Sequence, residues 1–474
     1  MRDSSHPNRA VIRQPLVFSD LTRLSEQFPE RYPHLLESVA KGDPNQADSL
    51  GRFDILFAFP QQSHVLQDVK TAATFIEEFE KEFSSLVQAP GLVDDIPFSG
   101  GWFGYFSYEY AQVIEPCLAL TNSALPLAVL QRFPAAIVID HQLQQVCFVA
   151  EPEYADCLEQ MQHDYAHSAD QAKIEEVTRS VEVEAVNEEA EAFFLQGVEH
   201  IKNYILAGDV FQVNLSREWQ IHLAKKTSPV DVYRQLRQHN PAPFACLVQF
   251  SKSSDSHSDP WAIISSSPER LVRYNAQTHC VDTRPIAGTR KRSESIAQDQ
   301  ALIAELISHP KERAEHIMLI DLERNDLGRI CEAGSVEVNE LMVIETYEHV
   351  HHIVSNVRGQ LKRGISPLQV IHALFPGGTI TGCPKIRCMQ IISELESGPR
   401  EAYTGSIGYI NRDGSMDFNI LIRSFIQEQN QLRFRAGAGI VADSVASGEL
   451  KETRHKAKGL LRALGCDTSG TSKS

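Results

Sequence analysis

KERAEHIMLIDL, residues 311–322, carries the clearest local pattern in this chain. Pro310 stands where a helix can begin, because a proline at the first helical position gives up no hydrogen bond. Glu312, Glu315 and Leu319 then recur at helical spacing and fall along one side of the predicted helix. The two glutamates therefore lie together at the edge of a stripe that faces the core.

A second pair of glutamates lies in the segment 449–464. Its apolar residues recur at helical spacing, and Glu449, Glu452 and Lys456 line the neighbouring face. If the two acidic faces meet, their negative charge needs compensation, and Mg²⁺ is the cation we expect there. Each pair alone is more often a solvent-exposed helix face, so the Mg²⁺ hypothesis depends on the motifs between them.

The composition indicates a soluble globular protein. The 474 residues are 42% hydrophobic, and no apolar run approaches the length of a membrane span. The first residues lack the apolar stretch of a signal peptide, so we expect a cytoplasmic protein. A net charge of −17 without a concentrated basic face argues against nucleic acid and anionic membranes as partners. The nine cysteines form no CxxC pair, which favours ordinary thiols over zinc ligands or disulfides.

The chain divides into two unequal parts. The first contains strand-like apolar runs such as FDILFAF from Phe53 and AAIVID from Ala135. The second opens on a predicted helix from Glu191 to Ala207, which Gly208 closes before the strand-like VFQVNLS. We therefore expect a mobile N-terminus at 1–15, a first region at 16–165, an acidic solvated connection at 166–189, a second region at 190–466 and a mobile tail at 467–474.

The glycine-rich segment FPGGTITGCPK, residues 375–385, lies between the two glutamate pairs. It is no nucleotide-binding P-loop, because Cys-Pro-Lys follows its last glycine in place of Lys-Ser/Thr. Its glycines instead let backbone N–H groups and Thr379 approach an anionic ligand closely. Since Arg423 and Lys456 add positive charge, the residues predict a small pocket for a dicarboxylate beside the metal.

Long motifs in a fixed order carry a resemblance to a known family. They are RPIAGTR from Arg284, AEHIMLIDLERNDLGR from Ala314, FPGGTITGCPK, YTGSIGY from Tyr403, MDFNILIRS from Met416, GAGIVADS from Gly437 and ELKETRHKAK from Glu449. The set resembles that of the chorismate-utilising enzymes and covers nearly all of the second region. The resemblance implies an α/β (α+β) fold like that of anthranilate synthase component I, a large antiparallel β-sandwich of two subdomains wrapped by helices. It also implies an Mg²⁺-dependent chorismate site within 190–466.

The resemblance implies a role for each matching residue. Glu315 and Glu452 would bind Mg²⁺, with Glu312 and Glu449 as close support. Glu269 would be the general acid that protonates the departing C4 hydroxyl, and His352 would lie beside the reacting ring. These roles suit the chemistry, since hydroxide leaves poorly without a proton donor and a Lewis acid on the ring carboxylate. The remaining substrate contacts would come from Gln212, Thr289, Thr379, Tyr403, Arg423, Gly437, Ala438, Gly439 and Lys456.

Gln212 separates family members that add water from those that use ammonia. Water-adding members carry a lysine base at this position, and a neutral amide cannot deprotonate water. Ammonia needs no such activation, which leaves aminodeoxychorismate synthases, serving 4-aminobenzoate and folate, and anthranilate synthases, serving tryptophan. Many aminodeoxychorismate synthases have a nucleophilic lysine where this chain has Ala287, and that position alone favours anthranilate synthase.

The surrounding motifs favour the aminodeoxychorismate side. GRFDILFA from Gly51, FPGGTITG, GSIGYI and MDFNILIRS resemble that side more closely than the corresponding anthranilate synthase forms. We therefore predict 4-amino-4-deoxychorismate as the product, with ammonia either displacing at C4 directly or following another nucleophile. A non-catalytic amino-acid-binding regulator is the contrasting class, and the complete set of acid, metal-ligand and anion-contact residues disfavours it.

The resemblance also implies two partners. Nothing in the chain resembles a glutamine amidotransferase, so a separate glutaminase subunit would supply the ammonia. LLES, residues 35–38, resembles a segment that binds tryptophan in the family, which makes Ser38 a candidate contact. The alternative for this segment is the end of a helix with two core leucines.

Overall fold

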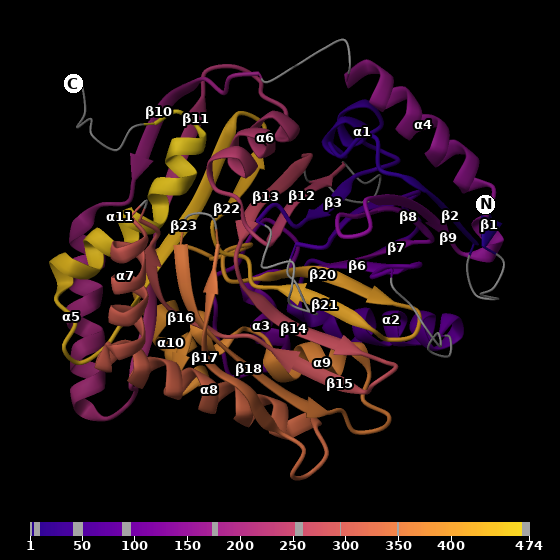
Figure 1. The fold of residues 1–474 in the computed structure, drawn as a ribbon. Coiled ribbons are helices and arrows are strands. Elements are labelled where there is room, and N and C mark those ends of the chain that lie inside the picture. Colours follow the sequence, from indigo (N-terminus) through magenta and orange to yellow (C-terminus); the bar gives the residue numbers. More distant parts are fainter. Residues whose placement is uncertain are drawn as a thin grey trace.

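Two antiparallel sheets pack face to face and are wrapped by helices (Figure 1). The structure, a computed structural model, describes residues 2–3, 10–40, 51–87, 96–172, 179–251, 259–293, 295–347 and 350–466. Within those ranges no helix is long and apolar enough to cross a membrane. The architecture confirms the predicted antiparallel sandwich wrapped by helices.

The larger sheet has 13 strands in the described part of the chain. Both regions of the sequence contribute strands to it. In spatial order the strands are β1 (Arg2–Asp3), β2 (Ala10–Pro15), β9 (Gln145–Ala150), β8 (Ala135–Asp140), β4 (Phe53–Ala58), β3 (His34–Glu37), β12 (Phe244–Phe250), β13 (Trp261–Ser267), β22 (Ser424–Glu428), β23 (Gln431–Ile440), β11 (Gln212–Leu223) and β10 (Val183–Glu188), with β19 (Gly382–Cys383) paired to β11.

The second sheet has 10 strands among the described residues and is equally mixed in origin. In spatial order they are β16 (Ile286–Lys291), β18 (Val350–Gln360), β15 (Cys280–Thr283), β14 (Arg270–Asn275), β21 (Met416–Asn419), β20 (Ser406–Asn411), β6 (Gly101–Phe106), β7 (Ala128–Phe133) and β5 (Ser63–Leu66), with β17 (Glu337–Thr346) paired to β18. The chain crosses between the sheets from β13 to β14 and again from β21 to β22. These two crossings meet, because the Ile420 N–H donates to the Glu269 carbonyl over 3.0 Å.

The continuous apolar strands are buried on both faces, as β8 illustrates. All six residues of its AAIVID sequence are buried. Ala136 and Val138 belong to the core between the sheets, whereas Ile137 and Ile139 belong to the core beneath the outer helices. This alternation follows from the two-residue period of a strand, and it explains why the sequence shows no polar face.

Helices cover both outer faces of the sandwich (Figure 1). Those packed on the larger sheet are α1 (Thr22–Gln27), α4 (Cys157–Ala172), α5 (Glu191–Ala207), α6 (Pro229–His239) and α11 (Ala446–Ala463). Those associated with the second sheet are α2 (Ala72–Leu86), α7 (Ile296–Ser308), α8 (Pro310–Ile330) and α9 (Pro367–Leu374), while α10 (Lys385–Leu395) packs on β11 and β19. Short helical turns are η1 (Val69–Thr71), η2 (Tyr108–Tyr110), α3 (Ala111–Ile114), η3 (Pro152–Tyr154) and η4 (Gly378–Ile380).

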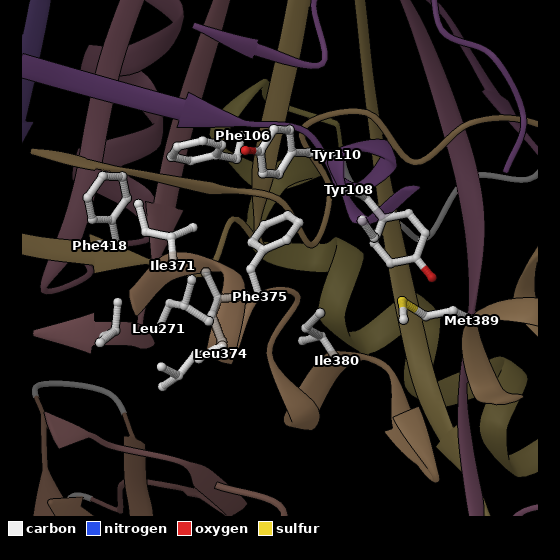
Figure 2. Close-up of a cluster of buried hydrophobic side chains, with 14 of the residues drawn as sticks. Phe106, Tyr108, Tyr110, Leu271, Ile371, Leu374, Phe375, Ile380, Met389 and Phe418 are labelled. Atoms are coloured by element: carbon white, nitrogen blue, oxygen red, sulfur yellow. The ribbon is translucent and has the colours of Figure 1, made fainter. Parts of the chain in front are cut away.

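An apolar cluster fixes the glycine-rich segment against the second sheet (Figure 2). Phe106 of β6 and Phe418 of β21 supply the sheet side, and Leu374 and Phe375 supply the end of α9. Ile380, the last residue of η4, is 5% exposed in the same cluster. The burial of Ile380 therefore fixes its neighbour Thr379 in place.

The helices predicted from local periodicity are confirmed. α5 spans Glu191–Ala207, and Gly208 ends it with a φ of 85°, a left-handed conformation that glycine adopts without a steric penalty. α8 begins at Pro310 and continues beyond the predicted end to Ile330. The predicted C-terminal helix is α11, so both glutamate pairs lie on helices.

Three expectations about chain organisation need correction. Residues 10–15 are not a mobile terminus, because β2 pairs along its whole length with β9. The acidic stretch 166–189 contains the end of α4 and the edge strand β10, whose polar side chains suit a strand with one exposed edge. Leu35 and Leu36 lie in β3, a strand, and not at a helix end. The predicted tail at 467–474 and most of 1–9 lie outside the described residues.

Candidate active site

Glu269 lies at the crossing from β13 to β14, where the two sheets meet. Its side chain belongs to a residue that is only 5% exposed, and its Oε1 has no hydrogen-bond partner among the described residues. Burial raises the pKa of Glu269 to about 7, against the opposing effects of the Thr379 hydroxyl, the Ile286 backbone, Lys456 and Arg423. A carboxyl group with this pKa is largely protonated just below neutral pH, which suits a general acid.

Arg423 lies at the other crossing, between β21 and β22, and faces Glu269 electrostatically. Its side chain is partly buried, and it makes no hydrogen bond or ion pair with any other residue that the structure describes. Burial lowers the pKa of Arg423, with the Glu269 charge acting in opposition. A partly buried guanidinium without a counter-ion is costly, so this position favours an anionic ligand.

Lys456 of α11 adds a second positive charge near Glu269. Its Nζ donates to the Gly437 carbonyl over 2.9 Å and lies 2.9 Å from Glu452 Oε1 on the same helix. About half of the Lys456 side chain stays exposed. Arg423 and Lys456 thus place two cations beside one buried acid, as the dicarboxylate hypothesis requires.

Two glycines of β23 make room for polar side chains from the neighbouring strand. A Cβ on Gly439 would lie 2.2 Å from Gln212 Nε2, and one on Gly437 would lie 2.6 Å from Asn214 Oδ1 and 2.7 Å from the Tyr403 hydroxyl. Gln212 Oε1 and Asn214 Oδ1 are both buried without a hydrogen-bond partner in the described part of the protein. Buried polar atoms without partners are rare, and a bound ligand would satisfy these.

The Ala438 side chain does not lie on the face of β23 where Gly437 and Gly439 adjoin Gln212 and Asn214. Successive side chains of a strand point to opposite faces, and Ala438 packs into the apolar core beside Leu215 and Ile440. Any contact of Ala438 with a ligand would therefore have to come from its backbone. Asn214, by contrast, was missed by the sequence analysis. The same alternation could have found it, because Asn214 lies two residues after Gln212 on the same face of β11.

His352 and Thr289 lie opposite each other on β18 and β16. His352 Nδ1 and the Thr289 hydroxyl share a hydrogen bond of 2.9 Å. Burial lowers the pKa of His352 to about 3, helped by the nearby positive charge of Arg423 and by His351. The imidazole is therefore neutral at physiological pH and can orient a ligand by hydrogen bonding without adding charge. Ala287, at the position where the family resemblance would place a nucleophilic lysine, lies on β16 with Thr289 and is 9% exposed.

The four predicted metal ligands do not assemble into a metal site in this structure. Among the described residues, no group of three or more His, Cys, Asp or Glu side chains is placed to hold a metal ion. Glu312 Oε1 is 2.8 Å from Arg290 Nη1, and Glu452 is paired with Lys456. Like charges repel, so carboxylates without a shared cation pair with the nearest basic side chains. Glu315 is partly buried and Glu449 is 8% exposed.

One carboxylate oxygen of these four glutamates could still bind a ligand or a metal ion. Glu312 Oε2 is buried without a hydrogen-bond partner among the described residues. It lies beside Gly288, where a Cβ would come within 2.2 Å of it. Four carboxylates suit Mg²⁺, which prefers oxygen ligands. In this structure, however, no three of the described carboxylates lie close enough together to bind one metal ion.

A separate cavity of about 400 Å³ lies at Ser38. Segments of both sheets line it, including Arg270 and Tyr409, and no residue predicted to bind chorismate takes part. The Ser38 hydroxyl donates to the Pro243 carbonyl over 2.9 Å, and the Ser38 N–H donates to Asp54 Oδ1 over 2.9 Å. Both hydrogen-bond donors of Ser38 are thus already used by the protein. Tryptophan binding here stays a prediction, which titration of the purified protein with tryptophan would check.

Comparisons with known proteins identify the family of this chain. The chorismate binding enzyme family matches residues 39–462. The chain is 42% identical to aminodeoxychorismate synthase component 1 of Bacillus subtilis over 77% of each chain, and 38% identical to anthranilate synthase component 1 of Pseudomonas aeruginosa over 84% of this chain and 80% of that one. It is also 37% identical to an anthranilate synthase component I-like protein of Synechocystis over 93% of this chain and 89% of that one.

Solved structures share the fold. Anthranilate synthase component I from Streptococcus pneumoniae superposes with a TM-score of 0.72 at 29% identity, covering 86% of this chain and 92% of that one. The menaquinone-specific isochorismate synthase of Escherichia coli superposes with a TM-score of 0.68 at 19% identity, covering 96% and 94%, which supports the fold alone. The match over most of the chain and the relatives above 30% identity lead to one conclusion: this chain belongs to the family of chorismate-binding enzymes.

Proposed function

We propose that this protein is an aminodeoxychorismate synthase that converts chorismate and ammonia into 4-amino-4-deoxychorismate. One observation carries the proposal. Among the buried polar side-chain atoms that lack a hydrogen-bond partner within the described residues, four lie at the candidate site beside Arg423 and Lys456; they belong to Gln212, Asn214, Glu269 and Thr379. Such a set suits a ligand with two carboxylates and hydroxyl or ether oxygens, as chorismate is.

Glu269 supplies the proton that the reaction needs. The C4–O bond of chorismate breaks with its electron pair on oxygen, and the protonated Glu269 carboxyl gives that oxygen a proton so that it leaves as water. The lone pair of ammonia forms the new C–N bond at C4, either directly or after another nucleophile has acted. The nitrogen then loses one proton, which the Glu269 carboxylate can take back, so the acid is restored.

The remaining site residues are placed to bind chorismate, to orient its ring and to disfavour attack by water. Arg423 and Lys456 are placed to balance the two carboxylates of chorismate, and neutral His352 is placed to face the ring. Gln212 cannot remove a proton from water, because an amide has no basic nitrogen. Water is therefore a poor nucleophile in this site, whereas ammonia attacks without a base.

The choice between the two ammonia-using activities depends on motifs, because relatives of both names are similar to this chain. Purified protein incubated with chorismate, Mg²⁺ and ammonium at alkaline pH is expected to form 4-amino-4-deoxychorismate without releasing pyruvate. Product identification by mass and fluorescence makes the distinction. Anthranilate and pyruvate would instead assign the anthranilate synthase activity, and unchanged chorismate would support the non-catalytic regulator.

We propose a separate glutaminase as the physiological source of ammonia, as is typical of component I proteins. The described residues form the two sheets and their covering helices, and the chorismate binding enzyme family matches residues 39–462, which supports a synthase that relies on another subunit for ammonia. Adding a glutaminase partner and glutamine is expected to replace ammonium in the assay above.

We also propose that activity requires Mg²⁺ held by Glu312, Glu315, Glu449 and Glu452. The donor chemistry and the unpartnered Glu312 Oε2 support this assignment. When bound there, Mg²⁺ would act as a Lewis acid on a substrate carboxylate. Because the placement of the four side chains does not complete the site, the steps above are derived without the metal.

Glu452→Gln is expected to raise the Mg²⁺ concentration for half-maximal chorismate consumption by more than about tenfold, as loss of a metal ligand does. Mg²⁺ titration after treatment with a chelator measures this. Glu191→Gln is the matched control, because it removes another exposed ion pair to α11, the one with Arg454. An unchanged requirement in Glu452→Gln would show that the glutamate assignment is wrong.

A further inference from the structure

Arg400 is a buried arginine that joins several walls of the candidate site. It lies in the loop after α10 and is 2% exposed. Its Nη2 donates to the Asn214 carbonyl over 2.7 Å, and its Nη1 donates to the Ile380 carbonyl over 3.2 Å. Its guanidinium also lies over the Tyr403 ring, 5.5 Å from the centroid. Arg400 lies outside the family motifs, three residues before YTGSIGY.

Each of these three contacts belongs to a segment that carries site residues. Asn214 lies on β11 two residues from Gln212, and its side chain reaches towards Gly437. Ile380 directly follows Thr379 in η4. Tyr403 presents its hydroxyl at the same glycine as Asn214. The guanidinium therefore sets the relative positions of β11, η4 and the Tyr403 loop.

Glu396 holds the guanidinium in this position. Arg400 Nε and Nη2 donate to the two Glu396 oxygens over 2.9 and 2.7 Å, and Ser216 donates to Glu396 Oε1 through both its N–H and its hydroxyl over 2.8 Å. Arg435 approaches the same carboxylate at 3.3 Å. Burial alone would lower the pKa of Arg400, but the charge and hydrogen bonds of Glu396, together with Tyr108 and Tyr403, raise the pKa above its ordinary value. Arg400 therefore stays charged.

The other side of Arg400 is apolar and aromatic. Its guanidinium lies over the Tyr108 ring, 4.8 Å from the centroid. Tyr108 in turn lies near Met389 and Ile380 in the buried cluster of Figure 2. The guanidinium thus has its ion pair on one side and a ring on another, which leaves it little freedom to move. A lysine cannot reproduce a planar group with five donors.

We propose that Arg400 is a positioning residue for chorismate, one that holds Asn214, Thr379 and Tyr403 in the arrangement that fits the substrate. This inference rests on the proposed function, because it assumes that these three residues contact chorismate. Arg400 itself does not reach the ligand side of the wall, since its guanidinium donors are directed to Glu396, to two backbone carbonyls and to the Thr404 hydroxyl.

Arg400→Lys tests the proposal. The variant is expected to stay folded, to bind chorismate with a dissociation constant about tenfold higher and to raise KM by a similar factor, because one ammonium group cannot hold two carbonyls and a carboxylate together. The kcat at saturating chorismate is expected to stay within about threefold. A purely structural role would instead lower the melting temperature and the active fraction and leave KM unchanged.

Arg132→Lys is the matched control. Arg132 is 6% exposed, donates to the Gly101 and Phe133 carbonyls over 2.9 Å each, pairs with Glu151 and lies over the Trp102 ring. It thus has the same kinds of partners as Arg400, but none of them is a site residue. We expect Arg132→Lys to lower stability and leave KM unchanged. An equal rise of KM in both variants, or in neither, would overturn the proposal.

If Arg400→Lys does not fold, Glu396→Asp tests the positioning role of Arg400 instead. It keeps the charge but withdraws the carboxylate by one methylene, so Arg400 loses part of its support, and a smaller rise of KM is expected. An unchanged KM would again overturn the proposal. Direct measurement of chorismate binding separates failure of the proposed function from failure of the Arg400 proposal. Wild-type protein that binds chorismate without consuming it would contradict the proposed function. The dissociation constants of the variants would still test the role of Arg400.

Discussion

Glu269→Gln is expected to lower kcat for chorismate amination by about 10³-fold, within the range that removal of a general acid produces. The amide has nearly the same shape as the protonated carboxyl group, so the KM for chorismate should stay within about threefold. The expected loss is large because the C4 oxygen would have to leave as hydroxide from a buried site. Steady-state kinetics with saturating ammonium measure both constants.

The pH dependence of the wild type provides a second readout of the same prediction. Burial raises the pKa of Glu269 to about 7, and the acid acts in its protonated form. With the free-ammonia concentration held constant, kcat/KM for chorismate should therefore fall as the pH rises through about 7. The residual activity of Glu269→Gln should lack this fall, because the amide does not titrate.

A matched control for Glu269 is Glu151→Gln. Glu151 is also buried, with a pKa that burial raises, but it pairs with Arg132 and Arg412. Removing its charge should affect stability and not the pH profile of kcat/KM. If Glu269→Gln retained more than about a tenth of wild-type kcat, another group would have to be the proton donor.

Arg423→Gln is expected to raise the KM for chorismate by about 10²-fold, since removing one partner of a buried charge pair costs roughly 2–5 kcal/mol. The structure leaves this guanidinium without a hydrogen bond or ion pair to any other described residue, so its binding capacity is available to a carboxylate ligand. Arg423→Lys should recover part of the affinity, because it restores the charge but not the two-pronged contact. Substrate titration of both variants gives the values.

Arg423→Gln should also change the titration of its neighbours. The positive charge of Arg423 lowers the pKa of both Glu269 and His352. Without it both pKa values rise, so the fall of kcat/KM with pH should move to higher pH than in the wild type. A substitution that only loosened the fold would not produce this shift.

Arg31→Gln is the control for Arg423. Arg31 is also partly buried, but it pairs with Asp164 of α4 and lies near Phe28 and Phe59, away from the predicted chorismate residues. It should leave KM and the pH profile unchanged. Equal KM values for wild type and Arg423→Gln would contradict the anion-binding role of Arg423.

The local elements of this fold were predictable because their cause is local. The helical periods of α5 and α8 and their starts or ends at Glu191, Gly208 and Pro310 depend on residues within a few turns of each other. The strands β4 and β8 followed from short apolar runs for the same reason. The order of those strands in the sheets did not follow, since pairs such as β3 with β12 join residues some 200 positions apart.

The site was predicted in part. The identities of Glu269, His352, Arg423 and Lys456 came from the family motifs, and in the structure the charge of Arg423 acts on both Glu269 and His352 while that of Lys456 acts on Glu269. Asn214 and Arg400 were missed, because their roles depend on which strand and which loop lie next to them. The four glutamates show the opposite case: each was predicted correctly to lie on a helix, but Glu312 pairs with Arg290, Glu452 pairs with Lys456, and the described carboxylates form no metal-binding group.

The sequence by itself determined the family, the types of side chain available for catalysis and the helices that carry them, because motif order and periodicity are properties of the chain alone. Only the tertiary structure decided which of these side chains are buried, which polar atoms lack partners and where charges lie close together. Burial raises the pKa of Glu269 to about 7 and lowers that of Arg423, whose guanidinium has no hydrogen bond or ion pair to another described residue. Both effects arise when two crossings between sheets, distant in sequence, remove these groups from water.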